Sequence, residues 1–217
     1  MVGNASRVNF ASFAGGSGPK RRPQRRRRGA GRNFRNRRPA FESLESRQLL
    51  AGDLAARFEF TDLGGSVLPS LQVGQEFEIR MYIRDIRSSP QGVFQAYFDD
   101  NCPSSLVSAN GSVSHGPEYS ADGTTSGNLN TPGVIDDVGG QDTDQFRPTP
   151  RDAELLLFSA PFRANQTGAV TLSVGEADRA DRIILFFDTV GGLPLNKIDF
   201  SGPGFNGAPP IEIVNPN

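Results

Sequence analysis

Apolar and polar residues alternate along much of the chain after residue 54. In the segment EFEIRMYIRDI, every second position is Phe77, Ile79, Met81 or Ile83, and the positions between them are charged or polar. A period of two, with aromatic and branched residues on one side, is typical of a half-buried strand in an antiparallel sheet. The pattern therefore predicts a strand with one face turned towards a core.

Eight more short runs of this kind are bounded by Gly, Pro, Asn or Asp. They are ARFEFTD, GVFQAYFDD, SLVSA, GVIDDV, AELLLFSAPFRA, GAVTLSVGEA, RIILFFDTV and PPIEIVN. Short strands separated by turn residues indicate an all-β sandwich or barrel. We therefore expect about nine strands, with EFEIRMYIRDI and GVFQAYFDD pairing as a hairpin.

Residues 110–133 lack any sustained periodicity and are rich in Gly, Ser, Asn and Thr. A loop of this length is uncommon in a compact domain and is usually functional or flexible. The alternative is a compact excursion packed by its own side chains, here Tyr119 and Leu129.

Charge divides the chain near residue 50. Residues 1–50 hold 13 Lys or Arg against 2 Asp or Glu, a net charge of +11, whereas the remainder holds 10 against 22, a net charge of −12. The basic part has few apolar side chains and cannot bury enough surface to offset the entropy of ordering. We therefore expect a disordered Arg-rich leader over residues 1–53 and a β domain over residues 54–217. Clustered arginines also bind phosphates, so a nucleic-acid partner is one alternative for the leader.

The longest apolar run in the leader, Leu49-Leu50-Ala51, is too short for an ordinary secretory signal. No segment approaches the roughly 18 apolar residues that a membrane span requires. The segment FESLESRQLLAGD instead resembles the Leu-Glu-Pro-Arg-x-Leu-Leu signal of exported planctomycete surface proteins. Ser46 stands where that family has proline. The matching positions are Phe41, Glu42, Leu44, Glu45, Arg47, Leu49, Leu50, Ala51 and Asp53. The resemblance implies a sorting segment over residues 39–53, export to the cell surface or beyond, and no need for a nucleic-acid partner.

The domain also resembles a known family. LQVGQEFEIRMYIRDIRSSPQGVFQAYFD is similar to the opening strands of cohesin-like domains, and the pattern continues through GVIDDVGG and AELLLFSAPFRANQTGAVTLSVGEAD. Cohesins are nine-stranded jelly-roll sandwiches, Ig-like in their layering, that bind dockerin modules and are related to carbohydrate-binding modules. The resemblance implies a cohesin-like fold and a partner on another molecule, either a dockerin-like module or a glycan. A carbohydrate-binding module linked to polysaccharide degradation is thus an alternative function.

Catalytic chemistry has little support in the sequence. A Ser-His-Asp triad needs a histidine as general base, and the only one, His115, lies in the loop-like region, where we expect it to be exposed. Cys102 is the only cysteine, so it is expected to be a buried small hydrophobe or a free thiol. A pair of carboxylates acting on sugars stays open, although the lack of Trp argues against it. We therefore expect a non-catalytic protein with no cofactor other than calcium.

Calcium is the only metal for which the sequence suggests a binding site. Asp136, Asp137, Asp142 and Asp144 surround a Gly-Gly pair that we expect to be flexible, and carboxylate oxygens suit Ca²⁺. The spacing differs from the Asp-x-Asp-x-Asp-Gly loop, so a solvated acidic loop is the alternative.

A flat recognition patch is also predicted from strand alternation. Tyr82 and Tyr97 fall on the outward faces of their strands, with Arg80 and Arg84 beside them. Ordinary surface decoration is the alternative interpretation of these four residues.

Overall fold

The computed structural model describes residues 52–144 and 152–216, all within a compact unit that spans residues 47–217. Apart from two single-turn 3-10 helices, η1 (Pro117–Tyr119) and η2 (Leu195–Lys197), the regular secondary structure of these residues consists of β-strands. No helix in the described part is long and apolar enough to cross a bilayer. The predicted leader and its sorting segment lie outside the described residues, except for Gly52 and Asp53.

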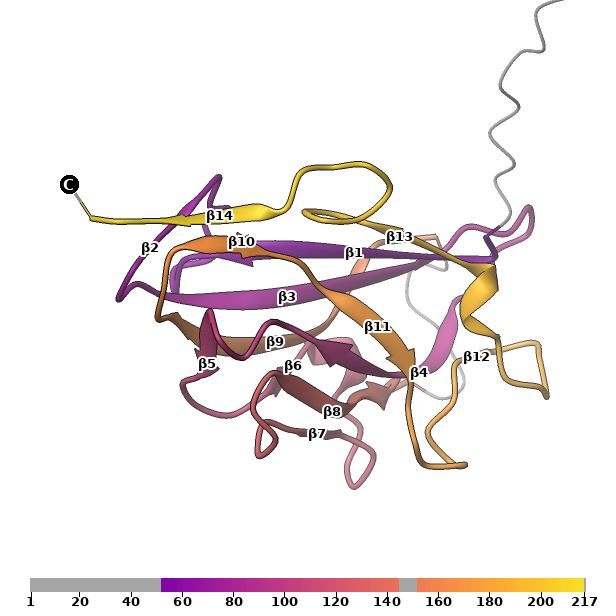
Figure 1. Cartoon of the computed structure of the whole chain (residues 1–217). Helices are drawn as coiled ribbons and strands as arrows, with labels where there is room; N and C mark the ends of the chain where they lie inside the picture. Colours follow the sequence, from indigo (N-terminus) through magenta and orange to yellow (C-terminus); the bar gives the residue numbers. More distant parts are fainter. Residues whose placement is uncertain (1–51, 145–151, 217) are drawn as a thin grey trace, which may run out of the picture. The chain divides into compact units, whose positions relative to one another are not determined.

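The strands form three sheets, which Figure 1 shows as layers of arrows. Sheet A has the order β13-β1-β3-β9-β5, and β6 also pairs with β9. Its strands are β1 (Leu54–Thr61), β3 (Glu76–Asp85), β5 (Val107–Ala109), β6 (Ser114–His115), β9 (Leu155–Ala164) and β13 (Ile198–Ser201). The long strands β1, β3 and β9 are antiparallel neighbours, whereas β13 runs parallel to β1.

Sheet C has the order β11-β4-β8-β7, and β12 also pairs with β4. Its strands are β4 (Val93–Asn101), β7 (Ser126–Asn128), β8 (Val134–Gln141), β11 (Ser173–Glu176) and β12 (Leu185–Phe186). A small sheet B has the order β10-β14-β2, formed by β2 (Leu71–Gln72), β10 (Gly168–Val170) and β14 (Ile211–Val214).

One apolar core connects the three sheets. On β3, the alternating residues Phe77, Ile79 and Met81 are fully buried, as the period-two pattern predicted. Sheet C contributes Phe98, whose ring meets Phe200 of β13 edge-on at 6.3 Å. The prediction of an all-β sandwich is therefore confirmed. The described residues contain fourteen strand segments rather than about nine, and six of these are only two or three residues long.

The predicted hairpin between EFEIRMYIRDI and GVFQAYFDD is wrong. The first segment is β3 of sheet A and the second is β4 of sheet C, so the chain crosses between sheets at residues 86–92. The buried carboxylate of Asp85 fixes this crossover by accepting hydrogen bonds from the backbone N–H groups of Gln91 at 2.8 Å and Gly92 at 3.0 Å. A turn that is held by a core carboxylate need not bring its flanking strands into one ladder.

The region 110–133 is a packed excursion rather than an open loop. It contains β6, η1 and β7, and Tyr119 is 1% exposed while Leu129 packs against the core. His115 is half-buried and its Nε2 lies 2.8 Å from the carbonyl oxygen of Ser126, so the expectation of a solvent-exposed histidine is wrong. Cys102 is buried, and burial raises the pKa of its thiol to about 12.

Candidate functional site

The four aspartates predicted to hold calcium do not lie together. Asp136 and Asp137 lie near the start of β8, whereas Asp142 and Asp144 follow its other end. Six residues of extended strand span about 20 Å. The Gly-Gly pair between them is part of the strand and is not a flexible loop. A Cβ at Gly139 would lie 1.8 Å from the carbonyl oxygen of Ala96, and a Cβ at Gly140 would lie 2.1 Å from that of Tyr119.

A different set of carboxylates does converge. Asp99, Asp136 and Asp178 bring one carboxylate oxygen each within 4.8 Å of one another. Asp137 connects them, because its N–H donates to Asp99 and its own carboxylate accepts from the N–H of Asp178. Burial, followed by the charges of Asp137, Asp178 and Asp136, raises the pKa of Asp99. Calcium binding stays a prediction, and only Asp136 of the predicted set belongs to this cluster.

The predicted recognition patch is divided between two sheets. Tyr97 of β4 turns away from the main core, as predicted, but it is only 1% exposed. The guanidinium of Arg182 lies 4.6 Å from its ring centroid, and the Tyr97 hydroxyl donates to the carbonyl of Thr124 at 2.7 Å. Tyr97 therefore cannot share a flat exposed surface with Tyr82, and this part of the prediction is wrong.

The remaining patch residues lie on the outer face of sheet A, where charges largely pair with one another. The guanidinium of Arg57 lies 4.6 Å from the ring centroid of Tyr82 and also pairs with Glu154 at 2.6 Å. Arg80 pairs with Glu78 of its own strand at 2.6 Å. Arg84 is exposed. A binding role for Tyr82, Arg80 and Arg84 stays a prediction.

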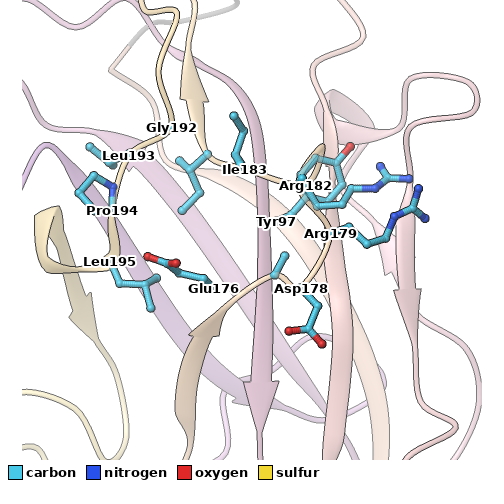
Figure 2. A pocket seen from close by; sticks show the side chains of 13 residues that line it. Tyr97, Glu176, Asp178, Arg179, Arg182, Ile183, Gly192, Leu193, Pro194 and Leu195 are labelled. Carbon is cyan, nitrogen blue, oxygen red and sulfur yellow. The ribbon is translucent and has the colours of Figure 1, made fainter.

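A hollow of about 370 Å³ lies at the edge of sheet C beside Tyr97. On this edge of β4, β11 pairs with residues 98–101 and β12 pairs with Gln95 and Val93, so Ala96 and Tyr97 fall between the two short strands. The chain between β11 and β12 leaves the sheet here, and it forms the hollow together with residues 192–195. Figure 2 shows Leu193, Pro194 and Leu195 on one side of the hollow and Tyr97 with Arg182 on the other.

The charged groups around the hollow differ in how far they are already engaged. Arg182 donates to the carbonyl of Thr124 at 2.6 Å while its guanidinium stacks on Tyr97. Arg179 pairs with Asp181 at 3.3 Å. Glu176, at the end of β11, makes no ion pair with any residue that the structure describes, and its carboxylate extends towards Leu195 in Figure 2. The hollow therefore offers a free carboxylate beside an apolar wall.

Sequence reasoning missed most of this site. Asp99, Asp178, Glu176 and Arg182 were not among the candidate residues predicted from the sequence. These residues lie up to 83 positions apart in the sequence, and only the pairing of β11 and β8 with β4 brings them together. The available signal was weak: acidic residues at the ends of two predicted strands.

Comparisons with known proteins return cohesins among solved structures. A Clostridium acetobutylicum cohesin solved in solution is 16% identical with a TM-score of 0.45, covering 74% of this chain and 90% of its own. The cohesin in a type I cohesin–dockerin complex from Clostridium thermocellum is 11% identical with a TM-score of 0.49, covering 76% and 96%. The seventh ScaB type I cohesin from Pseudobacteroides cellulosolvens is 12% identical with a TM-score of 0.44, covering 76% and 94%.

No family model matches the chain, and the curated proteins give no significant match. Scores this low carry no argument about family or ligand. The assignment of a β-sandwich rests on the three sheets themselves.

Proposed function

We propose that this chain is an exported, non-catalytic binding module of cohesin-like type. We propose further that it attaches to a dockerin-like module on another molecule through sheet C. The observation that carries the choice of surface is uncompensated charge. Asp99, Asp136, Asp178 and Glu176 form no ion pairs among residues 52–144 and 152–216. Asp99, Asp136 and Glu176 are held on strands and Asp178 follows β11 directly, so these groups are pre-organised to meet a complementary partner.

The outer face of sheet A is the competing surface. Its ion pairs, Arg57 with Glu154 and Arg80 with Glu78, already neutralise much of its charge. A partner that binds there gains little binding free energy from these charges. It must either break the existing ion pairs or leave them intact. Sheet C is therefore the better supported contact surface.

A protein partner is better supported than a glycan. Sugar rings are commonly bound by stacking on an exposed aromatic face. None of the three tyrosines offers a fully free ring: Tyr119 and Tyr97 are 1% exposed, and Arg57 already stacks on the half-buried Tyr82. A non-catalytic role is supported by His115, whose Nε2 is engaged with a backbone carbonyl rather than with a nucleophile.

Calorimetric titration of the full chain against a panel of dockerin modules tests the proposal. We expect at least one module to bind in a 1:1 complex. Reversing an exposed charge beside sheet C, in Asp178→Lys just after β11, is expected to weaken that complex about tenfold or more, because the partner meets a carboxylate without an ion pair there. The matched reversal on sheet A, Arg84→Glu, is expected to change affinity by less than about twofold.

Two results would contradict the proposal. If no module in the panel binds, the proposed partner is wrong. If Arg84→Glu weakens binding and Asp178→Lys does not, the contact surface is the outer face of sheet A, as the sequence patch predicted.

Export is the second part of the proposal and rests on the sorting-segment resemblance over residues 39–53. Processing near Ala51-Gly52 would leave Asp53 at the start of the domain, where its N–H donates to the carbonyl of Lys197 at 2.7 Å and its carbonyl accepts from Ile86 at 3.1 Å. N-terminal sequencing of protein recovered from the cell exterior is expected to begin close to Gly52. An intact Arg-rich leader on protein found only inside cells would overturn export.

A further inference from the structure

The hollow beside Tyr97 has the chemistry to accept one extended aliphatic cation. Its volume of about 370 Å³ lies at the small end of the range for ligand pockets, about 300–1,000 Å³. One wall is apolar, formed by Ile183, Leu193 and Leu195, and Ile183 is 36% exposed. An apolar wall of this size would bury a hydrocarbon stem but not a large ring system.

The two arginines beside the hollow are poorly placed to hold an anionic ligand. Arg182, the arginine nearest to Tyr97, has its Nη1 committed to the carbonyl of Thr124, and its Nε is buried, with no hydrogen-bond partner among the described residues. Arg179 is paired with Asp181. Neither guanidinium is free to make the two parallel hydrogen bonds by which arginine recognises a carboxylate or phosphate.

A cation, by contrast, finds a free partner. The carboxylate of Glu176 extends to the side of the hollow lined by Leu195, away from both arginines (Figure 2). Asp178 adds a second negative charge at the rim, next to Asp99 and Asp136. A charged group that reaches Glu176 would thus meet attraction there, while its stem lies on the leucine wall.

From these contacts we infer that the hollow binds a single arginine or lysine side chain presented by a partner protein. The stem would pack on Ile183, Leu193 and Leu195, and the charged end would pair with Glu176. A protein is favoured over a free small cation because the hollow is open at the sheet edge, where a partner backbone could pass. This inference rests on the proposed binding function and names the part of the partner that enters this site.

The test uses the full chain and a short acetylated, amidated peptide with one central arginine flanked by glycines. The control peptide replaces arginine with citrulline, which keeps the shape and removes the charge. We expect the arginine peptide to shift the amide NMR signals of residues 176–195 and to bind at least about tenfold more tightly than the citrulline peptide, as is typical of a charge-assisted hydrogen bond.

Substitutions then locate the contact. Glu176→Gln is expected to abolish the preference for arginine over citrulline, because it removes only the charge of an exposed side chain. Ile183→Ser is expected to weaken both peptides by removing apolar contact. The matched control, Glu212→Gln on the exposed side of β14 in sheet B, is expected to bind as the unaltered chain does. Melting curves of each variant confirm that it is folded.

Equal binding of the two peptides, an unchanged preference in Glu176→Gln, or shifts confined to other residues would each overturn the inference. The outcome is separable from that of the dockerin titration. A dockerin that binds normally to Glu176→Gln would leave the proposed function standing and remove the arginine site from it. An arginine preference without any dockerin binding would support the arginine site and overturn the dockerin-like partner. Tighter binding of spermidine than of the arginine peptide would show a free polyamine as the occupant and overturn the choice of a protein.

Discussion

Replacing Asp85 with alanine is expected to lower the free energy of unfolding by about 3–5 kcal/mol. The Asp85 side chain is fully buried and accepts hydrogen bonds from Nε and Nη2 of Arg87 and from the backbone N–H groups of Arg87, Gln91 and Gly92. Its removal takes from the largely buried Arg87 guanidinium the carboxylate that accepts two of its hydrogen bonds, and it removes the carboxylate acceptor of three backbone N–H groups. Urea denaturation of the full chain measures the loss.

The effect should extend beyond the crossover between the sheets. Arg87 also pairs with Asp188 at 2.9 Å and stacks 3.7 Å above the ring of Phe186, so it connects the crossover to β12. Arg84→Ala, an exposed change on the same strand, serves as the control and is expected to cost less than about 0.5 kcal/mol. A loss in Asp85→Ala no larger than this would show that the network does not hold the fold.

The stabilisation by Asp85 has a defined pH window. Burial by itself would raise the pKa of Asp85, but hydrogen bonds from Arg87, Gln91 and Gly92 outweigh it and lower the pKa below the ordinary 3.8. A lowered folded-state pKa means that the contribution is present above pH 3.8 and is lost as the pH falls through the folded-state value. The difference between the native chain and Asp85→Ala should therefore shrink only in strong acid.

Replacing Asp100 with asparagine is expected to have the opposite sign and to stabilise the protein by about 1–3 kcal/mol at pH 8, because a buried carboxylate costs more to keep from water than a neutral amide of the same shape. Asp100 is 1% exposed in β4, and neither of its carboxylate oxygens has a hydrogen-bond partner among the described residues. Burial, and then the charge of Asp99, raises its pKa well above 3.8. Asparagine keeps the shape and removes the cost of holding an ionisable group in the core.

The pH dependence identifies the cause. Because the folded-state pKa of Asp100 is raised, the free energy of unfolding is not reduced by this group below pH 3.8. It falls as the pH rises from there towards the folded-state pKa, because the buried carboxyl resists ionisation. Asp99 and Asp142 have raised pKa values and act in the same direction. Chemical denaturation at several pH values should thus show that the free energy of unfolding falls less with rising pH in Asp100→Asn than in the native chain.

The exposed control, Asp122→Asn, should show the same fall with pH as the native chain. A lower free energy of unfolding for Asp100→Asn than for the native chain at pH 8 would contradict the prediction.

Local pattern was enough to predict the strands but not their partners. The alternation around Phe77 and Met81 identified β3 and its buried face, because side-chain direction in a strand is set by the backbone alone. The pairing of that strand depends on residues 86–92, where a buried aspartate turns the chain into another sheet. Nothing in the hydrophobic pattern distinguishes this crossover from a hairpin turn.

The candidate site was less accessible to sequence reasoning for the same reason. Asp136 was identified as a candidate calcium ligand, but Asp142 was assigned to the same site because both residues flank the two glycines. Those glycines are required by the close approach of Ala96 and Tyr119, a contact between strands that no local signal encodes. Likewise, Tyr97 was correctly placed on the outer side of its strand, yet Arg182, 85 residues later, covers it.

The interrupted edge of β4 also bears on how the molecule behaves at high concentration. A long, continuous sheet edge offers a template on which another chain can add a strand, and this is a common route to aggregation. Here the edge is occupied by two short segments, β11 and β12, which are separated at Ala96 and Tyr97 by an outward excursion. A second molecule meets no unbroken ladder on this side, so the opening that admits a single side chain also protects the sheet from indefinite stacking.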